Sequence, residues 1–340
     1  MHINLISDTV TKPTSGMLDA MMKAEVGDDV FKNDPSVNRL EEMMANLFGM
    51  EGALFFPSGT MANQTAIKIH TQPGEQLICD KYAHIYNYEG GGVSFNSGVS
   101  CRLVDGHRGM MTADQVVEAI NPPDFYHSPL TALVCIENTT NKGGGACWDL
   151  EELKSIGKVC EEHHLKYHLD GARLWNALIA KNESALDYGA LFHTISVCLS
   201  KGLGCPVGSV LLGNREHIRK ALRVRKVLGG GMRQAGYLAA AGIYALENNR
   251  ERLAEDHKKA KEISEVLNGL PYIKKVEPTE TNIVIFEMNE KRMSPDDFLD
   301  KLNKRNVQII GMGQNKLRIV THMDYTNDKH AAFLDILSKL

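Results

Sequence analysis

Short apolar runs alternate with amphipathic helical segments along most of this chain of 340 residues. The alternation predicts a mostly parallel β-sheet with helices on both faces, because two neighbouring parallel strands need a crossover connection, which is usually a helix. Helices are expected at residues 36–48, from residue 61 onward and at 149–163. Strands are expected at residues 53–56, 76–79, 131–136, 166–169, 194–199 and 207–212. The fold class that follows is α/β.

The pattern changes near residue 250, where a strongly charged helix to residue 267 begins. Further strands are expected at residues 273–276, 282–286, 307–310 and 316–320, with one helix opened by Ser294-Pro295 and another at the end of the chain. We expect a large domain at residues 1–248, including the N-terminal segment, and a smaller α+β domain at residues 249–340.

Composition narrows the classes of partner. With 38 Lys and Arg against 42 Asp and Glu, the chain has no basic excess to attract nucleic acid or an anionic membrane, so a small-molecule substrate is expected. No apolar run reaches the roughly 18 residues of a membrane span, and the N-terminus lacks a signal-peptide pattern, which favours the cytoplasm. The 7 cysteines show no metal-ligand spacing, so buried thiols and no bound metal are expected.

Lys201 stands at the end of an apolar strand in the run Thr-Ile-Ser-Val-Cys-Leu-Ser-Lys-Gly-Leu-Gly. A lysine in such a place usually has a specific partner, and a free amine there suits Schiff-base chemistry with an aldehyde cofactor. The alternative is a lysine whose stem lies along the strand end while its amine reaches water.

Asp170 follows a second apolar strand, at the edge where open α/β sheets bind ligands. Pyridoxal 5′-phosphate needs a carboxylate beside its ring nitrogen, and Arg173 points to the same place. Residues 58–60 (Ser-Gly-Thr) form a strand-to-helix turn that suits a phosphate. The alternatives are that Asp170 caps a helix, that Arg173 is a surface residue and that the turn is only a turn.

The whole pattern closely resembles the low-specificity L-threonine aldolases, which are pyridoxal-phosphate enzymes of fold type I, the aspartate-aminotransferase type. The resemblance covers residues 3 to about 325 and is carried by residues 7–11, 27–31, 34–37, 56–63, 169–173 and 229–234. It implies retro-aldol cleavage of L-threonine, L-allo-threonine and other β-hydroxy-α-amino acids to glycine and an aldehyde.

By this resemblance, Lys201 forms the Schiff base and His84 stacks on the cofactor ring and takes part in catalysis. Cofactor contacts are also implied for Ser58, Gly59, Thr60, Asp170 and Arg173, and for Arg233, which reaches the phosphate from a neighbouring subunit. The substrate contacts implied are Ser7, Phe31, Tyr88, His127, Arg173 and Arg318. The resemblance also implies a homotetramer whose active-site unit is a dimer.

Two departures from the family pattern bear on substrate preference. Phe31-Lys32 stands where the family commonly has Tyr and Gly, and Thr140 stands where it commonly has His. The base that takes the β-hydroxyl proton is expected to be His84 or His127. Two other functions share the same cofactor residues: β-elimination from Ser, Cys or aromatic amino acids, and cofactor binding without catalysis.

Overall fold

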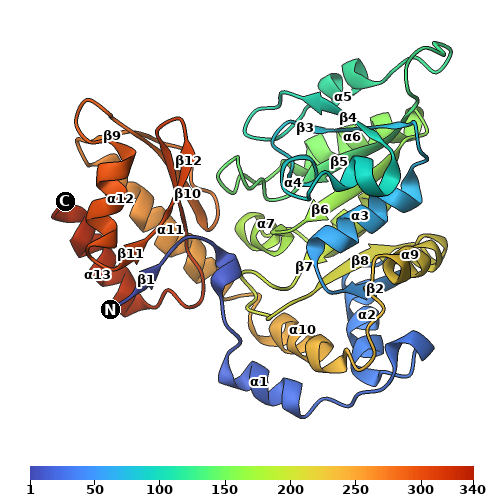
Figure 1. Cartoon of the computed structure of the whole chain (residues 1–340), viewed down its shortest axis with the longest axis horizontal. Coiled ribbons are helices and arrows are strands. Elements are labelled where there is room, and N and C mark those ends of the chain that lie inside the picture. The colour runs from blue at the N-terminus through green and yellow to red at the C-terminus, as the bar shows by residue number, and fades with distance from the viewer.

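The computed structural model describes all 340 residues, and a central sheet of seven strands organises its larger part (Figure 1). The strands lie side by side in the order β2 (Gly52–Phe56), β8 (Ser209–Gly213), β7 (Thr194–Cys198), β6 (Lys166–Gly171), β5 (Thr131–Glu137), β3 (Gln76–Asp80) and β4 (Ser100–Val104). Only β8 runs antiparallel to its neighbours, so the sheet is mostly parallel, as predicted.

Successive side chains of the strands point to opposite faces, and helices bury both. Leu54 and Phe56 of β2 pack on one face with α3 (Gly59–His70) and α9 (Arg215–Val227), whereas Ala53 and Phe55 pack on the other. Helix α4 (His84–Asn87) adds to the first face. The helices of the second face are α1 (Ser15–Met22), α2 (Pro35–Phe48), α5 (Ala113–Ala119), α6 (Leu150–Glu162), α7 (Leu174–Lys181), α8 (Ala185–Leu191) and α10 (Gly236–Asn248).

Helix α2 shows how local sequence sets an element. Asp34 caps its N-terminus by accepting a hydrogen bond from the Val37 N–H at 3.0 Å, and Pro35 occupies the first helical position. Gly49 ends the helix at a φ of 63°, which favours glycine. These are the residues expected to start and stop a helix, and its predicted range is confirmed.

The smaller part, at the left of Figure 1, is an antiparallel sheet with three helices. The strand order is β12 (Ile310–Gly313), β13 (Lys316–Val320), β10 (Ile283–Met288) and β9 (Ile273–Val276). The helices α11 (Leu253–Asn268), α12 (Pro295–Asn303) and α13 (Asn327–Ser338) share its apolar core. An α+β unit was predicted here.

The first strand corrects the expected place of the N-terminal segment. Strand β1 (Ile3–Asn4) pairs in parallel with β11 (Val307–Gln308), so the N-terminus lies beside the C-terminal unit (Figure 1). Ile3 and Leu5 are buried in the core of that unit. The chain therefore begins in the small unit and crosses to the large one, which sequence order could not indicate. The boundary at residue 248 stays a prediction.

One further strand was missed, and two strands were merged into one. Strand β4 lies at the sheet edge with Ser100 and Arg102 exposed, so it lacks the apolar pattern of a buried strand. The single strand expected at residues 307–310 is two, because β11 pairs with β1 while β12 pairs with β13.

All 7 cysteines are free, and only Cys101 is more than slightly exposed. None of the helices has the length and apolar character that crossing a membrane requires.

Candidate functional site

The predicted site residues gather where the central parallel strands end. Glu137 ends β5 and lies opposite Asp170 of β6 in the sheet register. Asp170 in turn lies opposite Ser196 of β7, and Lys201 follows β7 directly. Carboxylates from neighbouring strands and a lysine therefore share one edge of the sheet, as the sequence predicted for Asp170 and Lys201.

Lys201 lies against the strand-to-helix turn before α3. Its Nζ is 3.4 Å from the Cys198 Sγ, and a Cβ added at Gly59 would lie 3.1 Å from the same sulfur. Ser58 uses its side chain to cap α3 at the Met61 N–H, 3.2 Å away. The first N–H groups of the helix, from Gly59 and Thr60, have no partner within the helix, so the turn offers donors to an anion beside the lysine.

Asp170 is a buried carboxylate that has no cationic partner. Its Oδ2 accepts a hydrogen bond from Asn63 Nδ2 at 2.9 Å, and its Oδ1 accepts one from the Ala172 N–H at 3.0 Å. Its side chain does not cap α7, which begins after Arg173. A buried carboxylate held only by neutral donors is suited to a cationic ligand, since an unpaired buried charge is costly.

His84 lies over this carboxylate at the start of α4. One ring nitrogen of His84 and one carboxylate oxygen each of Glu89 and Asp170 lie within 4.8 Å of one another. Burial opposes protonation of the ring, but the hydrogen bond to Glu89 and the negative charges of Asp170, Glu89 and Glu137 outweigh it and raise the pKa of His84. An imidazole with a raised pKa beside an anion-rich pocket is a candidate acid and base.

Glu137 shapes the backbone around His84. Its two oxygens accept hydrogen bonds from the N–H groups of His84 and Asn141, each at 2.7 Å. Burial, followed by the nearby charge of Asp170, raises the pKa of Glu137 to about 7. Two carboxyl groups on adjacent strands with different environments are thus built into this edge.

Two arginines meet at the entrance to the site. Arg173 binds Asp8 through two hydrogen bonds of 2.8 and 2.7 Å, and both residues are buried. Arg318 of the small unit donates to Asn141 Oδ1 at 2.8 Å and to the Ile6 carbonyl at 3.1 Å. Arg173 Nη1 lies 3.5 Å from the same Asn141 oxygen, and the buried Nε of Arg318 has no partner. The pair offers an unfilled place for an anion.

A cleft of about 390 Å³ opens here between the two units. From the large unit it is lined by His84, Tyr88, Asn141 and Lys142. Arg318 and the strand β12 close it from the other side. The cleft has room for a small charged molecule, and Tyr88, whose ring lies 5.5 Å from that of His84, forms part of its wall.

Comparison with known proteins decides the family. The model of the family described as Beta-eliminating lyase matches residues 4–291. Low-specificity L-threonine aldolase 1 of Arabidopsis thaliana is 42% identical over 336 residues, which are 96% of this chain and 93% of that protein. The chain belongs to the threonine aldolase family. The low specificity L-threonine aldolase of Escherichia coli K12 is 40% identical, covering 97% of this chain and 96% of its own.

The fold agrees with the same family. The solved structure of a threonine aldolase from Leishmania major has a TM-score of 0.85 and covers 99% of both chains at 20% sequence identity. At that identity the likeness shows the shared fold, which is the fold type I arrangement that the sequence predicted.

Three predicted residues of this family member lie away from the cleft. His127 is exposed in the loop before β5, and its ring contacts are with Phe125 and Tyr126. Phe31 is 69% exposed, and Arg233 pairs with Asp28 at 2.9 Å. The structure of one chain does not bring them to Lys201, so their roles remain predictions.

Ser7 lies nearer the arginines. It stands between Ile6, which binds Arg318, and Asp8, which binds Arg173. Its Oγ accepts a hydrogen bond from the Thr9 hydroxyl at 2.8 Å.

The two departures from the family pattern have separate structural settings. Lys32 adopts a φ of 58°, a left-handed conformation that suits the glycine commonly found there, and it pairs with Glu41 at 2.9 Å. Thr140 is buried and lines a small internal cavity with Gly109 and Gly143, not the cleft. Thr140 is therefore not among the residues that line the cleft.

Sequence reasoning missed the groups that hold the predicted residues in place. Asp8 and Asn63 lie inside segments that carry the resemblance, but the sequence assigned no role to them. Glu137 directly follows the strand expected at residues 131–136 and was also given no role. Glu89 directly follows Tyr88, and nothing in its sequence setting marks it. A buried polar side chain becomes noticeable only when its hydrogen-bond partners, which are distant in sequence, are known.

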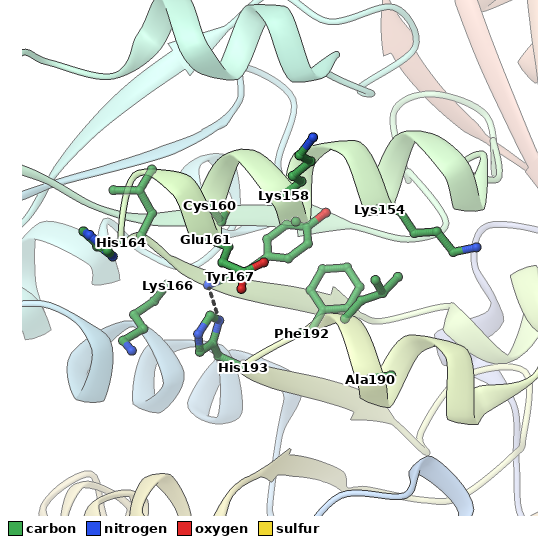
Figure 2. Close-up of a pocket in the computed structure, with 13 residues that line it drawn as sticks. Lys154, Lys158, Cys160, Glu161, His164, Lys166, Tyr167, Ala190, Phe192 and His193 are labelled. Carbon is green, nitrogen blue, oxygen red and sulfur yellow. Dashed lines mark hydrogen bonds between the residues drawn. The ribbon is translucent and has the colours of Figure 1, made fainter.

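A cavity larger than the cleft lies elsewhere in the molecule. It has a volume of about 640 Å³ and lies between α6 and the starts of β6 and β7 (Figure 2). Lys166 begins β6 there, and His193 precedes β7 and accepts a hydrogen bond from the Tyr167 N–H at 3.1 Å. This end of the sheet is opposite to the one that carries Asp170 and Lys201.

Proposed function

We propose that this protein cleaves L-threonine, L-allo-threonine and related β-hydroxy-α-amino acids to glycine and an aldehyde, with pyridoxal 5′-phosphate as cofactor. The observation that carries the proposal is the pair of arginines, Arg173 and Arg318, which leaves a buried N–H unpaired beside the edge that holds Lys201 and Asp170. A substrate carboxylate satisfies that donor. Membership of the threonine aldolase family supports the same substrate class.

The chain's own groups fit the cofactor. Lys201 supplies an amine next to the turn of Gly59 and Thr60, whose N–H groups suit the phosphate while Ser58 fixes the turn. Asp170, buried without a cation, suits the protonated ring nitrogen. When bound, pyridoxal phosphate provides the electron sink for cleavage of the Cα–Cβ bond.

The remaining groups hold the substrate and move its proton. Arg318 and Arg173 bind the carboxylate, with Ser7 beside them, and so orient the β-hydroxyl within the cleft. We assign the uptake of the hydroxyl proton to His84, because His84 lines the cleft whereas His127 lies in an exposed loop. Glycine and the aldehyde together contain all the atoms of the substrate. The proton that His84 takes is therefore returned to the products in the same turnover.

The first test is aldehyde release from L-threonine and L-allo-threonine by the purified protein with pyridoxal phosphate. We expect release from wild type and a fall in kcat/KM of about 100-fold for Arg318→Leu, chiefly through KM, because a charge-assisted carboxylate contact is lost. The control is Arg305→Leu. Arg305 is an exposed arginine of the same unit that donates a hydrogen bond to the Lys301 carbonyl, and its replacement is expected to leave kcat/KM as in wild type.

A different product would redirect the assignment. Ammonia and a keto acid from serine or cysteine, without aldehyde from either threonine, identify β-elimination instead. Bound cofactor with no turnover on any of these amino acids identifies a protein without catalysis.

We infer that the active protein is a homotetramer in which pairs of subunits complete each site. The support is an uncovered surface near residues 27–33 and 227–233: Val227 and Phe31 are 86% and 69% exposed, and Arg233 has only Asp28 as ionic partner. Light scattering is expected to give four chains, and Arg233→Ala is expected to weaken cofactor binding about tenfold through a lost phosphate contact. A fully active monomer would exclude this arrangement.

The free cysteines support a reducing compartment, and we place the protein in the cytoplasm on that ground. Fractionation of the source cells tests this location, since recovery from an oxidising compartment would contradict it.

A further inference from the structure

A buried carboxyl group contacts the ring of His84 and is not among the residues that line the cleft. Glu89 follows the short helix α4 and is only 6% exposed. Its Oε1 is 3.0 Å from His84 Nδ1 and 2.9 Å from Asn63 Nδ2, and its Oε2 is 2.7 Å from Gln64 Nε2. Both oxygens thus have donors, and none of the donors except His84 is titratable.

The chemistry of these partners fixes the direction of each hydrogen bond. The amide nitrogens of Asn63 and Gln64 can only donate, so Glu89 accepts a hydrogen bond from each of them. An ionised carboxylate only accepts hydrogen bonds, so the hydrogen of its contact with the ring lies on His84 Nδ1.

We propose that Glu89 is a positioning residue for His84: it binds the Nδ1–H of the ring and so leaves Nε2 as the nitrogen that serves the substrate. The role of Nε2 rests on the function proposed above, whereas the pairing of Glu89 with His84 does not.

The side-chain amide of Asn63 is held in one orientation, with its nitrogen toward Glu89. Its oxygen is bound by the Ser196 hydroxyl at 2.5 Å and lies 3.2 Å from His168 Nε2. Its nitrogen bridges Glu89 and Asp170. Asn63 is buried, so exchange of its oxygen and nitrogen would place the amide oxygen against the carboxylates of Glu89 and Asp170, with no water to replace the lost hydrogen bonds. Glu89, Asp170 and the ring of His84 are consequently held in one fixed frame.

Several charged groups surround His84, and Glu89 is the one it touches through its ring. Asp170 and Glu137 act through space and stay in place when Glu89 is changed. Tyr88 packs beside the ring, and the Lys142 Nζ lies 5.3 Å from the Tyr88 ring centre. Removing the charge of Glu89 takes away a hydrogen-bonded anion and leaves these groups, so the protonated form of His84 becomes less stable.

The test uses the full-length protein loaded with pyridoxal phosphate and compares Glu89→Gln with wild type. The histidine titration of His84, followed by NMR and assigned with His84→Asn, is expected to move to lower pH by about one pH unit in Glu89→Gln. The acid limb of kcat/KM against pH for threonine cleavage is expected to move with it. Glu89→Leu, which removes the acceptor, is expected to lower kcat/KM by about 10- to 100-fold, with partial rescue by Gln.

Two further comparisons separate positioning from general stability. Glu152→Gln removes the charge of a different side-chain acceptor, one that binds the Ala113 N–H, and is expected to leave both the titration and the pH profile unchanged. In the His84→Asn background, Glu89→Leu is expected to add little further loss, because the two residues act as one unit. If Glu89→Gln does not fold, Glu89→Asp keeps the charge but shortens the side chain, which weakens the contact with His84, and it is expected to shift the titration in the same direction by a smaller amount.

An unchanged His84 titration in a folded Glu89→Gln protein, or independent losses in the double variant, would overturn the proposal. Wild-type protein that releases no aldehyde would defeat the proposed function alone, because the NMR titration reports on the pair without any turnover.

Discussion

Replacing Lys201 with alanine is expected to abolish both the visible absorbance of bound pyridoxal phosphate and the cleavage of threonine. The Lys201 amine lies beside the turn proposed to bind the phosphate, 3.4 Å from the Cys198 Sγ. Loss of a covalent catalytic group lowers turnover by a factor of about 1,000 or more. Absorbance spectra after dialysis and aldehyde release measure the two effects.

The matched control is Lys166→Ala. Lys166 is also a partly buried lysine of the central sheet, but it begins β6 at the opposite end (Figure 2). This variant is expected to keep its cofactor and its activity. Normal threonine cleavage by Lys201→Ala would remove Lys201 from the mechanism.

The second large effect is expected at the buried ion pair of Asp8 and Arg173. Burial alone would raise the pKa of Asp8, but the charge and hydrogen bonds of Arg173, with smaller contributions from Lys201 and Asn282, lower it to about 2. Arg173→Leu leaves a buried carboxylate without its cation and is expected to reduce the free energy of unfolding by about 3–5 kcal/mol. Urea denaturation followed by circular dichroism measures this loss.

A second substitution, at Asp8, tests whether the unpaired carboxylate causes the loss of stability. The double variant Asp8→Asn with Arg173→Leu is expected to recover part of the stability, since no unpaired charge remains, yet to stay inactive because the substrate carboxylate has lost a partner. The exposed pair of Arg39 and Glu247 is the control, and Arg39→Leu is expected to cost less than about 1 kcal/mol. A loss as small for Arg173→Leu would contradict the role given to this pair.

The elements of the fold were largely predictable because the central strands are buried on both faces. Their apolar runs are short and continuous, and local signals such as Asp34 and Gly49 mark helix ends. The edge strand β4 was not predictable by this route, because its exposed residues carry no such pattern. Asp170 and Lys201 could be placed together from the sequence because each follows a predicted strand, and the carboxyl ends of parallel strands meet at one edge of the sheet.

The groups that complete the site depend on contacts between distant parts of the chain. Arg318 meets Arg173 at Asn141 only because the small unit packs against the strand ends of the large one. Asn63 joins Asp170 to Glu89 because α3 lies across the sheet face.

The sequence by itself determined the α/β class and the family, and it placed Asp170 and Lys201 at the ends of neighbouring strands, because these follow from local periodicity and from short motifs. The tertiary structure alone decided that β1 joins the C-terminal unit, that Asp8 neutralises Arg173 and that Glu89 orients His84. In each case a buried polar group must find a partner within the protein, because burial removes the water that would otherwise form its hydrogen bonds. The partners are distant in sequence, so only the folded structure shows which groups pair.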